Sequence, residues 1–117
     1  MHWWITLAWL VWSASMNACV YKVLTQPEWD GFQKAGTFQG SPADARDGFI
    51  HLSGKDQVEG VIARYFQGQR PLFIVEFSAE KFGKSLRWET SHAGEKFPHL
   101  YGRELKVSDV LRSQVRR

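Results

Sequence analysis

The sequence predicts one small α+β domain with two main helices. The chain has 117 residues, of which 44% are hydrophobic and 15% are aromatic. This length and composition suit one compact core and are too small for two. Short apolar runs of strand length, such as residues 72–77, are interleaved with helical patterns, of which residues 58–66 form the clearest. Composition changes abruptly near residue 20, and we therefore assign the domain to residues 19–117.

Residues 1–18 form an apolar N-terminal extension. The first Lys, Arg, Asp or Glu in the chain is Lys22. Three interpretations stay open: a signal peptide, a membrane anchor, or upstream sequence added by a start assigned too early. A signal peptide has basic residues before its apolar stretch, and a spanning helix needs about 20 apolar residues. Neither fits well here, so we favour a natural start at Met16, just before the first predicted strand.

Cysteine usage and charge narrow the class of protein. Cys19 is the single cysteine, which excludes an intrachain disulfide and a cysteine-based zinc site. We therefore expect a reducing, cytoplasmic location, or a secreted or membrane-anchored one if residues 1–18 are genuine. The net charge is +3, with both signs alternating along most of the chain. We expect no nucleic-acid partner, no stable membrane partner for residues 19–117, and no metal site.

The first predicted elements are a strand over residues 19–24 and a helix directly after it. The strand segment is rich in β-branched and aromatic residues. Thr25 can cap the helix and Glu28 can reach back to it, while Gly36 is placed to end it in a left-handed conformation. The turn-rich residues 37–45 predict a connection.

Residues 49–53 read as a short strand, and a second amphipathic helix follows. Ser53 with Asp56 suits its start, and apolar residues then recur at helical spacing over residues 58–66. Gly60 interrupts this pattern at a cost of about 1 kcal/mol relative to Ala. It indicates either close packing or simple tolerance.

The second half of the domain contains mainly strands. Residues 72–77 are almost continuously apolar, which predicts a central strand. One helical turn is expected over residues 79–83 and a shorter strand over residues 86–89. Residues 90–102 begin with turn-prone or polar residues ahead of Phe97, which predicts a loop. The last two strands are expected at residues 105–107 and 110–115.

His51 is the first candidate for chemistry. Side chains alternate faces along a strand, so Ile50 and Leu52 share one face, while Phe49, His51 and Ser53 share the other. If Ile50 and Leu52 face the core, the second group lines a cleft of the kind that binds small molecules. The alternative is a half-buried structural histidine held by hydrogen bonds.

His99 is the second candidate, because Pro98 fixes the backbone beside it. A positioned imidazole can transfer a proton near neutral pH; the alternative is a loop residue packing on a neighbouring ring. Trp88 and Glu89 offer an aromatic platform and a carboxylate on opposite strand faces, although such a glutamate is more often a surface acid. The motifs GxGxxG, GxxxxGK[ST], HExxH and GxSxG are absent, which removes the common nucleotide, zinc-protease and esterase signatures.

Several motifs together resemble a bacterial family called domain of unknown function 952. They are VYKVL, WxxFxxAGxFxGS, RDGFIHLS, YFxG, WExS and FPHLYG, and they occur in the family's order. DGFIHLS and FPHLYG are the most specific. The resemblance implies a small, bent and split sheet of the ADP-ribosylation-like type, and a pocket that grips NAD or a related nucleotide.

The resemblance also implies roles for particular residues. Lys22 occupies the place of the residue that holds the dinucleotide in ADP-ribosyltransferases, and residues 49–53 resemble the strand that frames the nicotinamide. His99 stands where those enzymes have a glutamate that stabilises an oxocarbenium-like centre. Without that carboxylate, ordinary ADP-ribosyl transfer to protein is in doubt.

Two functions of different class follow. The first is an enzyme that processes the ribosyl or phosphoryl groups of NAD or a related nucleotide. NAD would be its substrate, and no bound cofactor is required for folding. The second is a catalytically inactive module that binds a ligand or a partner protein. The expected catalytic residues are His51, His99 and Glu89, and the expected substrate-binding residues are Lys22, Phe49, Ser53, Gln57, Trp88 and Tyr101.

Overall fold

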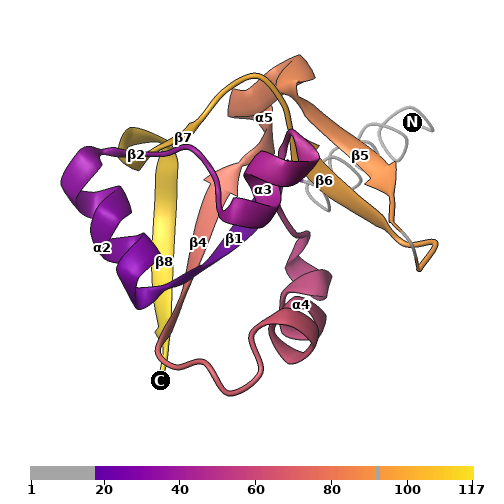
Figure 1. The fold of residues 1–117 in the computed structure, drawn as a ribbon. Helices are drawn as coiled ribbons and strands as arrows, with labels where there is room; N and C mark the ends of the chain where they lie inside the picture. The colour runs from indigo at the N-terminus through magenta and orange to yellow at the C-terminus, as the bar shows by residue number, and fades with distance from the viewer. Residues whose placement is uncertain (1–17, 92) are drawn as a thin grey trace, which may run out of the picture.

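The computed structural model describes residues 18–91 and 93–117, and the predicted extension lies almost entirely outside them (Figure 1). Among the described residues, no helix has the length and apolar character needed to cross a membrane. The elements are, in order, β1 (Cys19–Thr25), α2 (Gln26–Ala35), β2 (Thr37–Phe38), α3 (Pro42–Asp47), β3 (Ile50–His51), η1 (Lys55–Gln57), α4 (Val58–Tyr65), β4 (Leu72–Ser78), α5 (Ala79–Phe82), η2 (Gly83–Ser85), β5 (Leu86–Thr90), β6 (Lys96–Leu100), β7 (Leu105–Lys106), η3 (Val107–Asp109) and β8 (Val110–Arg116).

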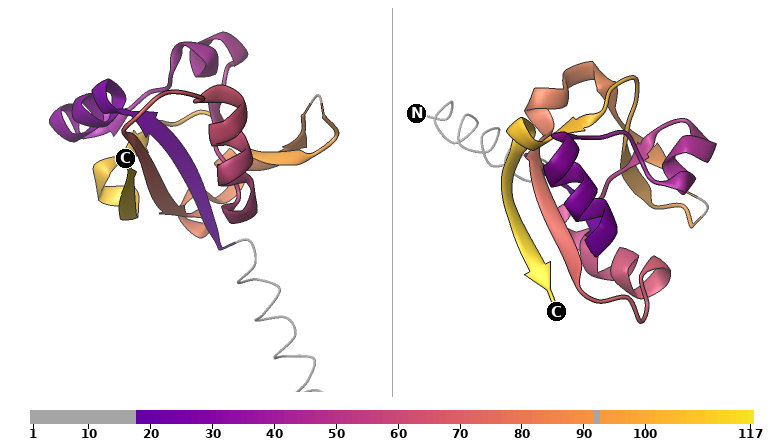
Figure 2. Two further views of the ribbon diagram at one scale, coloured as in Figure 1. Left: turned by 90° about the horizontal axis from the view of Figure 1, so that it is seen from below. Right: turned by 60° about the vertical axis from the view of Figure 1, so that its left-hand side comes forward.

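In the described part of the chain, the strands form three antiparallel groups: β1-β4-β8, β2-β7 and β3-β6-β5. The apolar strand β4 is central in its sheet, as predicted. Tyr21 and Ser53 exchange two backbone hydrogen bonds of 2.8 Å, which join β1 to the chain just after β3. The hairpin of β5 and β6 projects away from β1-β4-β8 (Figure 2). The α+β class is therefore confirmed.

The sheet β1-β4-β8 has apolar side chains on both faces, and each face has its own core. The larger core contains Val20 and Phe77 together with Phe32 of α2. The smaller core contains Val23 and packs against Ile62 of α4. Because successive strand residues point to opposite faces, the helices α2 and α4 cover opposite sides of this sheet.

The predicted ends of the helix α2 are confirmed. The Thr25 hydroxyl accepts a hydrogen bond from the Glu28 backbone, and Glu28 Oε1 accepts one from the Thr25 backbone N–H at 3.0 Å. This reciprocal pair satisfies two N–H groups that a helix start leaves without partners. At the other end, Gly36 has φ 80° and donates its N–H to Phe32 at 2.8 Å.

The turn-rich interpretation of residues 37–45 was wrong, because this segment contains β2 and most of α3. The sequence Ser41-Pro42-Ala43-Asp44 is itself a helix start. Ser41 Oγ accepts from the Asp44 N–H at 3.2 Å, and Asp44 Oδ2 accepts from the Ser41 N–H at 2.9 Å. Aspartate at the third position replaces the more usual glutamate, so the signal was read as a turn.

The loop predicted over residues 90–102 was also wrong, because it contains β6. Pro98 lies in the middle of this strand, where a proline is unusual because it has no N–H to donate. Its carbonyl still accepts from the Leu52 N–H at 3.0 Å. The start of α4 differs as well: Gln57 Oε1 accepts from the Gly54 N–H at 2.9 Å, in place of the expected Ser53 cap.

Candidate functional site

The sheet β3-β6-β5 brings the two predicted histidines together on one face. His51 pairs directly with His99, which pairs on its other side with Arg87. The ring centroids of the two histidines are 5.6 Å apart. Ile50 and Leu52 belong to the larger core, so the alternation expected for residues 49–52 is confirmed, whereas Ser53 is buried and departs from it. We call this surface the histidine face and define it by His51, His99, Phe49, Tyr101, Glu89 and Arg87.

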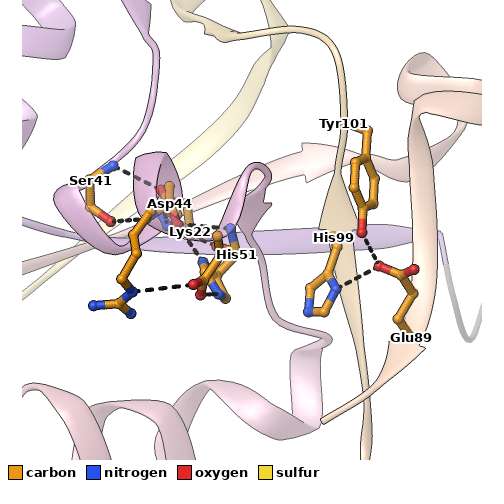
Figure 3. Close-up of polar contacts among 9 residues, drawn as sticks. Lys22, Ser41, Asp44, His51, Glu89, His99 and Tyr101 are labelled. Carbon is orange, nitrogen blue, oxygen red and sulfur yellow. Dashed lines mark hydrogen bonds and ion pairs between the residues drawn. The ribbon is translucent and has the colours of Figure 1, made fainter.

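Asp44 anchors one side of this face from a buried position. Its Oδ1 lies 2.6 Å from Nδ1 of His51 and accepts the His51 backbone N–H at 3.0 Å. Its Oδ2 accepts from Nζ of Lys22 at 3.0 Å (Figure 3). Burial opposes ionisation of this carboxyl, but the hydrogen bond from His51, the charge of Lys22 and the backbone donors outweigh it. The pKa of Asp44 is therefore well below its ordinary value.

Lys22 is used inside the protein. Its buried ammonium donates to Asp44 and, at 2.9 Å, to the backbone carbonyl of His51. These contacts tie β1 to α3 and β3. Its predicted contact with a ligand stays a prediction, and the geometry gives it a positioning role for His51.

The second ring nitrogen of His51 also faces a carboxylate. Nε2 lies 2.9 Å from Oδ2 of Asp47, whose Oδ1 accepts from Nε of Arg46 at 3.2 Å. The hydrogen bond from Arg46 lowers the pKa of Asp47, with further lowering from His51. A neutral imidazole has one N–H, whereas an imidazolium donates from both nitrogens. Both carboxylate contacts of His51 are therefore hydrogen bonds when the ring is protonated.

His99 is oriented by Glu89 on the other side of the face. Nδ1 of His99 lies 2.8 Å from Oε1 of Glu89, and the Tyr101 hydroxyl donates to the same oxygen at 2.5 Å. The hydrogen bonds from Tyr101 and then His99 lower the pKa of Glu89, and the bond to Glu89 raises the pKa of Tyr101. The predicted catalytic group of His51, His99 and Glu89 is therefore assembled on one surface.

Phe49 connects the two histidines. Its ring stacks on His99 at 4.0 Å between centroids and lies 4.6 Å from the His51 ring and 5.2 Å from the Tyr101 ring. The Arg87 guanidinium lies 4.7 Å from the centre of the Tyr101 ring. An exposed cation therefore borders the aromatic rings of this face.

Three predicted binding residues lie elsewhere. Ser53 is buried beside β1. Trp88 pairs with Pro98, on the opposite sheet face from His99, and its ring lies against the backbone of Gly54. Gln57 Nε2 donates to the Lys96 carbonyl at 2.7 Å, which ties the start of α4 to the β5–β6 hairpin. We therefore leave these residues out of the histidine face.

Three polar residues of the site were missed by sequence reasoning: Asp44, Asp47 and Arg87. The capping pattern Ser41-Pro42-Ala43-Asp44 could have revealed the first. Asp47 lies within the RDGFIHLS motif four residues before His51, but this spacing has no fixed meaning outside a helix. Arg87 becomes recognisable once β5 is paired with β6. No group of three or more His, Cys, Asp or Glu arranged for a metal occurs among residues 18–91 and 93–117.

The site can orient two imidazoles beside aromatic rings. A histidine whose Nδ1 donates to a carboxylate presents Nε2 as an acceptor when neutral and as a donor when protonated. His99 has this arrangement. The His51 side chain is 39% exposed and that of His99 is 11% exposed, so His51 meets solvent more directly.

The comparisons with known proteins agree with the motifs. The model of the family described as Protein of unknown function (DUF952) matches residues 23–113. The chain belongs to this family. A crystal structure of protein CC0527 from Caulobacter crescentus is 44% identical in sequence with a TM-score of 0.78, covering 83% of this chain and 84% of that chain. A solution NMR structure of the same protein gives 45% identity and a TM-score of 0.73 over 82% of each chain. No curated protein matches the chain.

Proposed function

We propose that the histidine face binds a nucleotide-like ligand through its phosphate or ribose groups. The observation that carries this proposal is the pairing of His51 with His99. Each imidazole is held through Nδ1 by a carboxylate, and both contact Phe49. Nε2 of His99, with Arg87 beside it, can donate to a phosphate oxygen, and the rings of Phe49 and Tyr101 supply apolar surface for a base or sugar.

The reaction class that suits this arrangement is acid–base processing of a phosphoryl or ribosyl group. Nε2 of His99 would give or take a proton, while Glu89 fixes the ring and stabilises the imidazolium that forms. Glu89 also supplies a carboxylate beside His99, the residue that stands where ADP-ribosyltransferases have a glutamate. In its more specific form, the proposal is that the fold is ADP-ribosyltransferase-like and that NAD is the substrate.

Calorimetric titration with NAD, ADP-ribose and a 2′,3′-cyclic nucleotide tests ligand binding. We expect at least one of the three to bind, and we expect His99→Gln to weaken that binding about tenfold or more, since hydrogen bonds to charged groups contribute roughly 1.5–3 kcal/mol. Arg64→Ala is the control, because Arg64 is exposed on α4 and is not one of the residues that define the histidine face. Absence of binding to all three ligands would contradict the proposal.

The second candidate function is a catalytically inactive module that binds a ligand or a partner protein. One observation favours it: the polar atoms of Lys22, Asp44 and His51 satisfy one another within the protein. Release of nicotinamide from NAD, followed by chromatography, separates the two candidates. Turnover by the wild type but not by His99→Gln supports the enzyme, whereas binding without turnover supports the inactive module.

A further inference from the structure

Asp47 occupies a position on His51 that an anionic ligand would need. Its two carboxylate oxygens contact nitrogen atoms of two different side chains: Oδ2 faces Nε2 of His51 at 2.9 Å, and Oδ1 accepts from Nε of Arg46 at 3.2 Å. Two oxygens of one phosphate can take two donors in the same way. Asp47 therefore makes the contacts with His51 and Arg46 that a phosphate group would make.

Asp47 contributes little to the stability of the folded protein at this position. It is the last residue of α3, where the negative end of a helix disfavours a carboxylate. Both contacts of Asp47 are poorly shielded, because the side chains of Arg46, His51 and Asp47 are 73%, 39% and 35% exposed, and exposed ion pairs contribute little. Gly48 follows directly with φ 83°, so the backbone turns sharply after Asp47.

Asp44, the other carboxylate that contacts His51, is held in place by more contacts and is shielded from solvent. Asp44 is buried, bonds Lys22 and the helix start, and contacts Nδ1. It fixes the ring and cannot leave without unpairing a buried ammonium. Of the two acids, Asp47 is the one that a ligand can displace.

We propose that Asp47 is a built-in competitor of the ligand: an anionic group, such as a phosphate, replaces its carboxylate on Nε2 of His51 and on Arg46. This inference rests on the proposed function and deepens it, because it assigns the anion of the ligand to the His51 end of the histidine face. Asp47 then sets the affinity of this end of the histidine face for that anion.

The test is an NMR titration of the full chain with inorganic phosphate and with ADP-ribose. Asp47→Asn removes the charge and keeps the shape. Asp47→Ser removes the charge and also shortens the side chain, so that it no longer reaches His51 and Arg46. Asp30→Asn is the matched control, because it makes the same change in net charge at an exposed position on α2. We expect both Asp47 variants to bind the probes roughly two- to fivefold more tightly than Asp30→Asn, as the loss of one exposed ion pair predicts.

The outcomes separate this inference from the proposed function. Tighter binding by both Asp47 variants, with the largest signal changes at the His51 ring, supports it, including the case in which only these variants bind measurably. Binding by the wild type with equal or weaker binding by both Asp47 variants overturns the inference and leaves the proposed function intact. Absence of binding by the wild type and every variant overturns both. Amide spectra of each variant verify that it is folded.

Discussion

At the scale of single residues, Asp44 has the largest structural role in the site. One carboxylate completes the start of α3, pairs with the buried Lys22 and fixes the ring of His51. A buried charge is tolerated only when it is paired and hydrogen-bonded, and Asp44 meets this condition through contacts from three separate elements. Asp44, a residue of the short helix α3, therefore fixes the orientation of the His51 ring on β3.

Asp44→Ala is expected to lower the free energy of unfolding by about 3–5 kcal/mol, because it leaves the Lys22 ammonium buried without its charged partner. Urea denaturation at neutral pH measures this difference. Asp30→Ala, at an exposed position, is expected to change the stability by less than about 0.5 kcal/mol. A loss below about 1 kcal/mol for Asp44→Ala would contradict the role given to the buried pair.

The lowered pKa of Asp44 predicts a dependence of stability on pH. A carboxyl whose pKa is lower in the folded than in the unfolded protein stabilises the fold above its unfolded pKa of about 3.9. That contribution is lost as the pH falls from about 4 through the lower folded pKa. Urea denaturation at pH 6 and pH 3 should show a larger loss in the wild type than in Asp44→Asn. Equal losses would mean that Asp44 is not held ionised.

At the scale of elements, the helices α2 and α3 begin with the same kind of cap, but only the first is easily recognised in the sequence. Thr25 and Glu28 form a familiar capping box and predicted α2, whereas Ser41 and Asp44 form a less familiar one and α3 was missed. Strand β6 was missed for a different reason. Pro98 is a loop signal locally, but hydrogen bonds from both neighbouring strands hold its segment in the sheet.

The two interpretations of Gly60 in α4 can be decided by substitution. A Cβ atom added at Gly60 meets nothing within 4 Å, which favours tolerance over close packing. Gly60→Ala should raise the free energy of unfolding by about 0.5–1 kcal/mol through helix propensity and a less flexible unfolded chain. Gly36→Ala is the paired control in denaturant titrations. It should lower stability by about 1 kcal/mol, because Gly36 has positive φ and a side chain is disfavoured there. Destabilisation by Gly60→Ala would show that the site is crowded after all.

At the scale of the whole molecule, the sheet β1-β4-β8 lies between two cores, and the larger core also packs against the sheet β3-β6-β5 that carries the histidine face. The larger core includes Ile50 and Leu100 from the sheet that carries the histidines, together with Phe77 from β4. The site sheet and the central sheet therefore share one packed interior. The backbone pair between Tyr21 and Ser53 adds a second connection between them.

This shared interior predicts that the site unfolds together with the domain. Phe77 is fully buried, so Phe77→Ala should lower the free energy of unfolding by about 3–5 kcal/mol. In urea, tryptophan fluorescence and the NMR signals of His51 and His99 should change at the same midpoint in the wild type and at the same lower midpoint in the variant. Ile62→Val in the smaller core should cost about 0.5–1.5 kcal/mol. Separate midpoints for fluorescence and histidine signals would show that the histidine face folds independently.

The sequence alone determined much of this protein. It predicted the α+β class, the central strand, both longer helices and the family, because propensity, capping and apolar spacing act over a few neighbouring residues. It also predicted which histidines to examine. It did not predict Asp44, Asp47 and Arg87 as their neighbours.

Only the tertiary structure decided those contacts, because pairing between residues far apart in sequence depends on strand register and on which elements meet. The pairing of β5 with β6 brings Glu89 within reach of His99, and the fold brings Lys22 of β1 to Asp44 of α3. Strand alternation already predicted that Trp88 and Glu89 face opposite ways, but only the pairing of β5 with β6 put Glu89, and not Trp88, on the side of His99. Local patterns fix the elements, whereas the chemistry of the site depends on side chains that only the folded chain brings together.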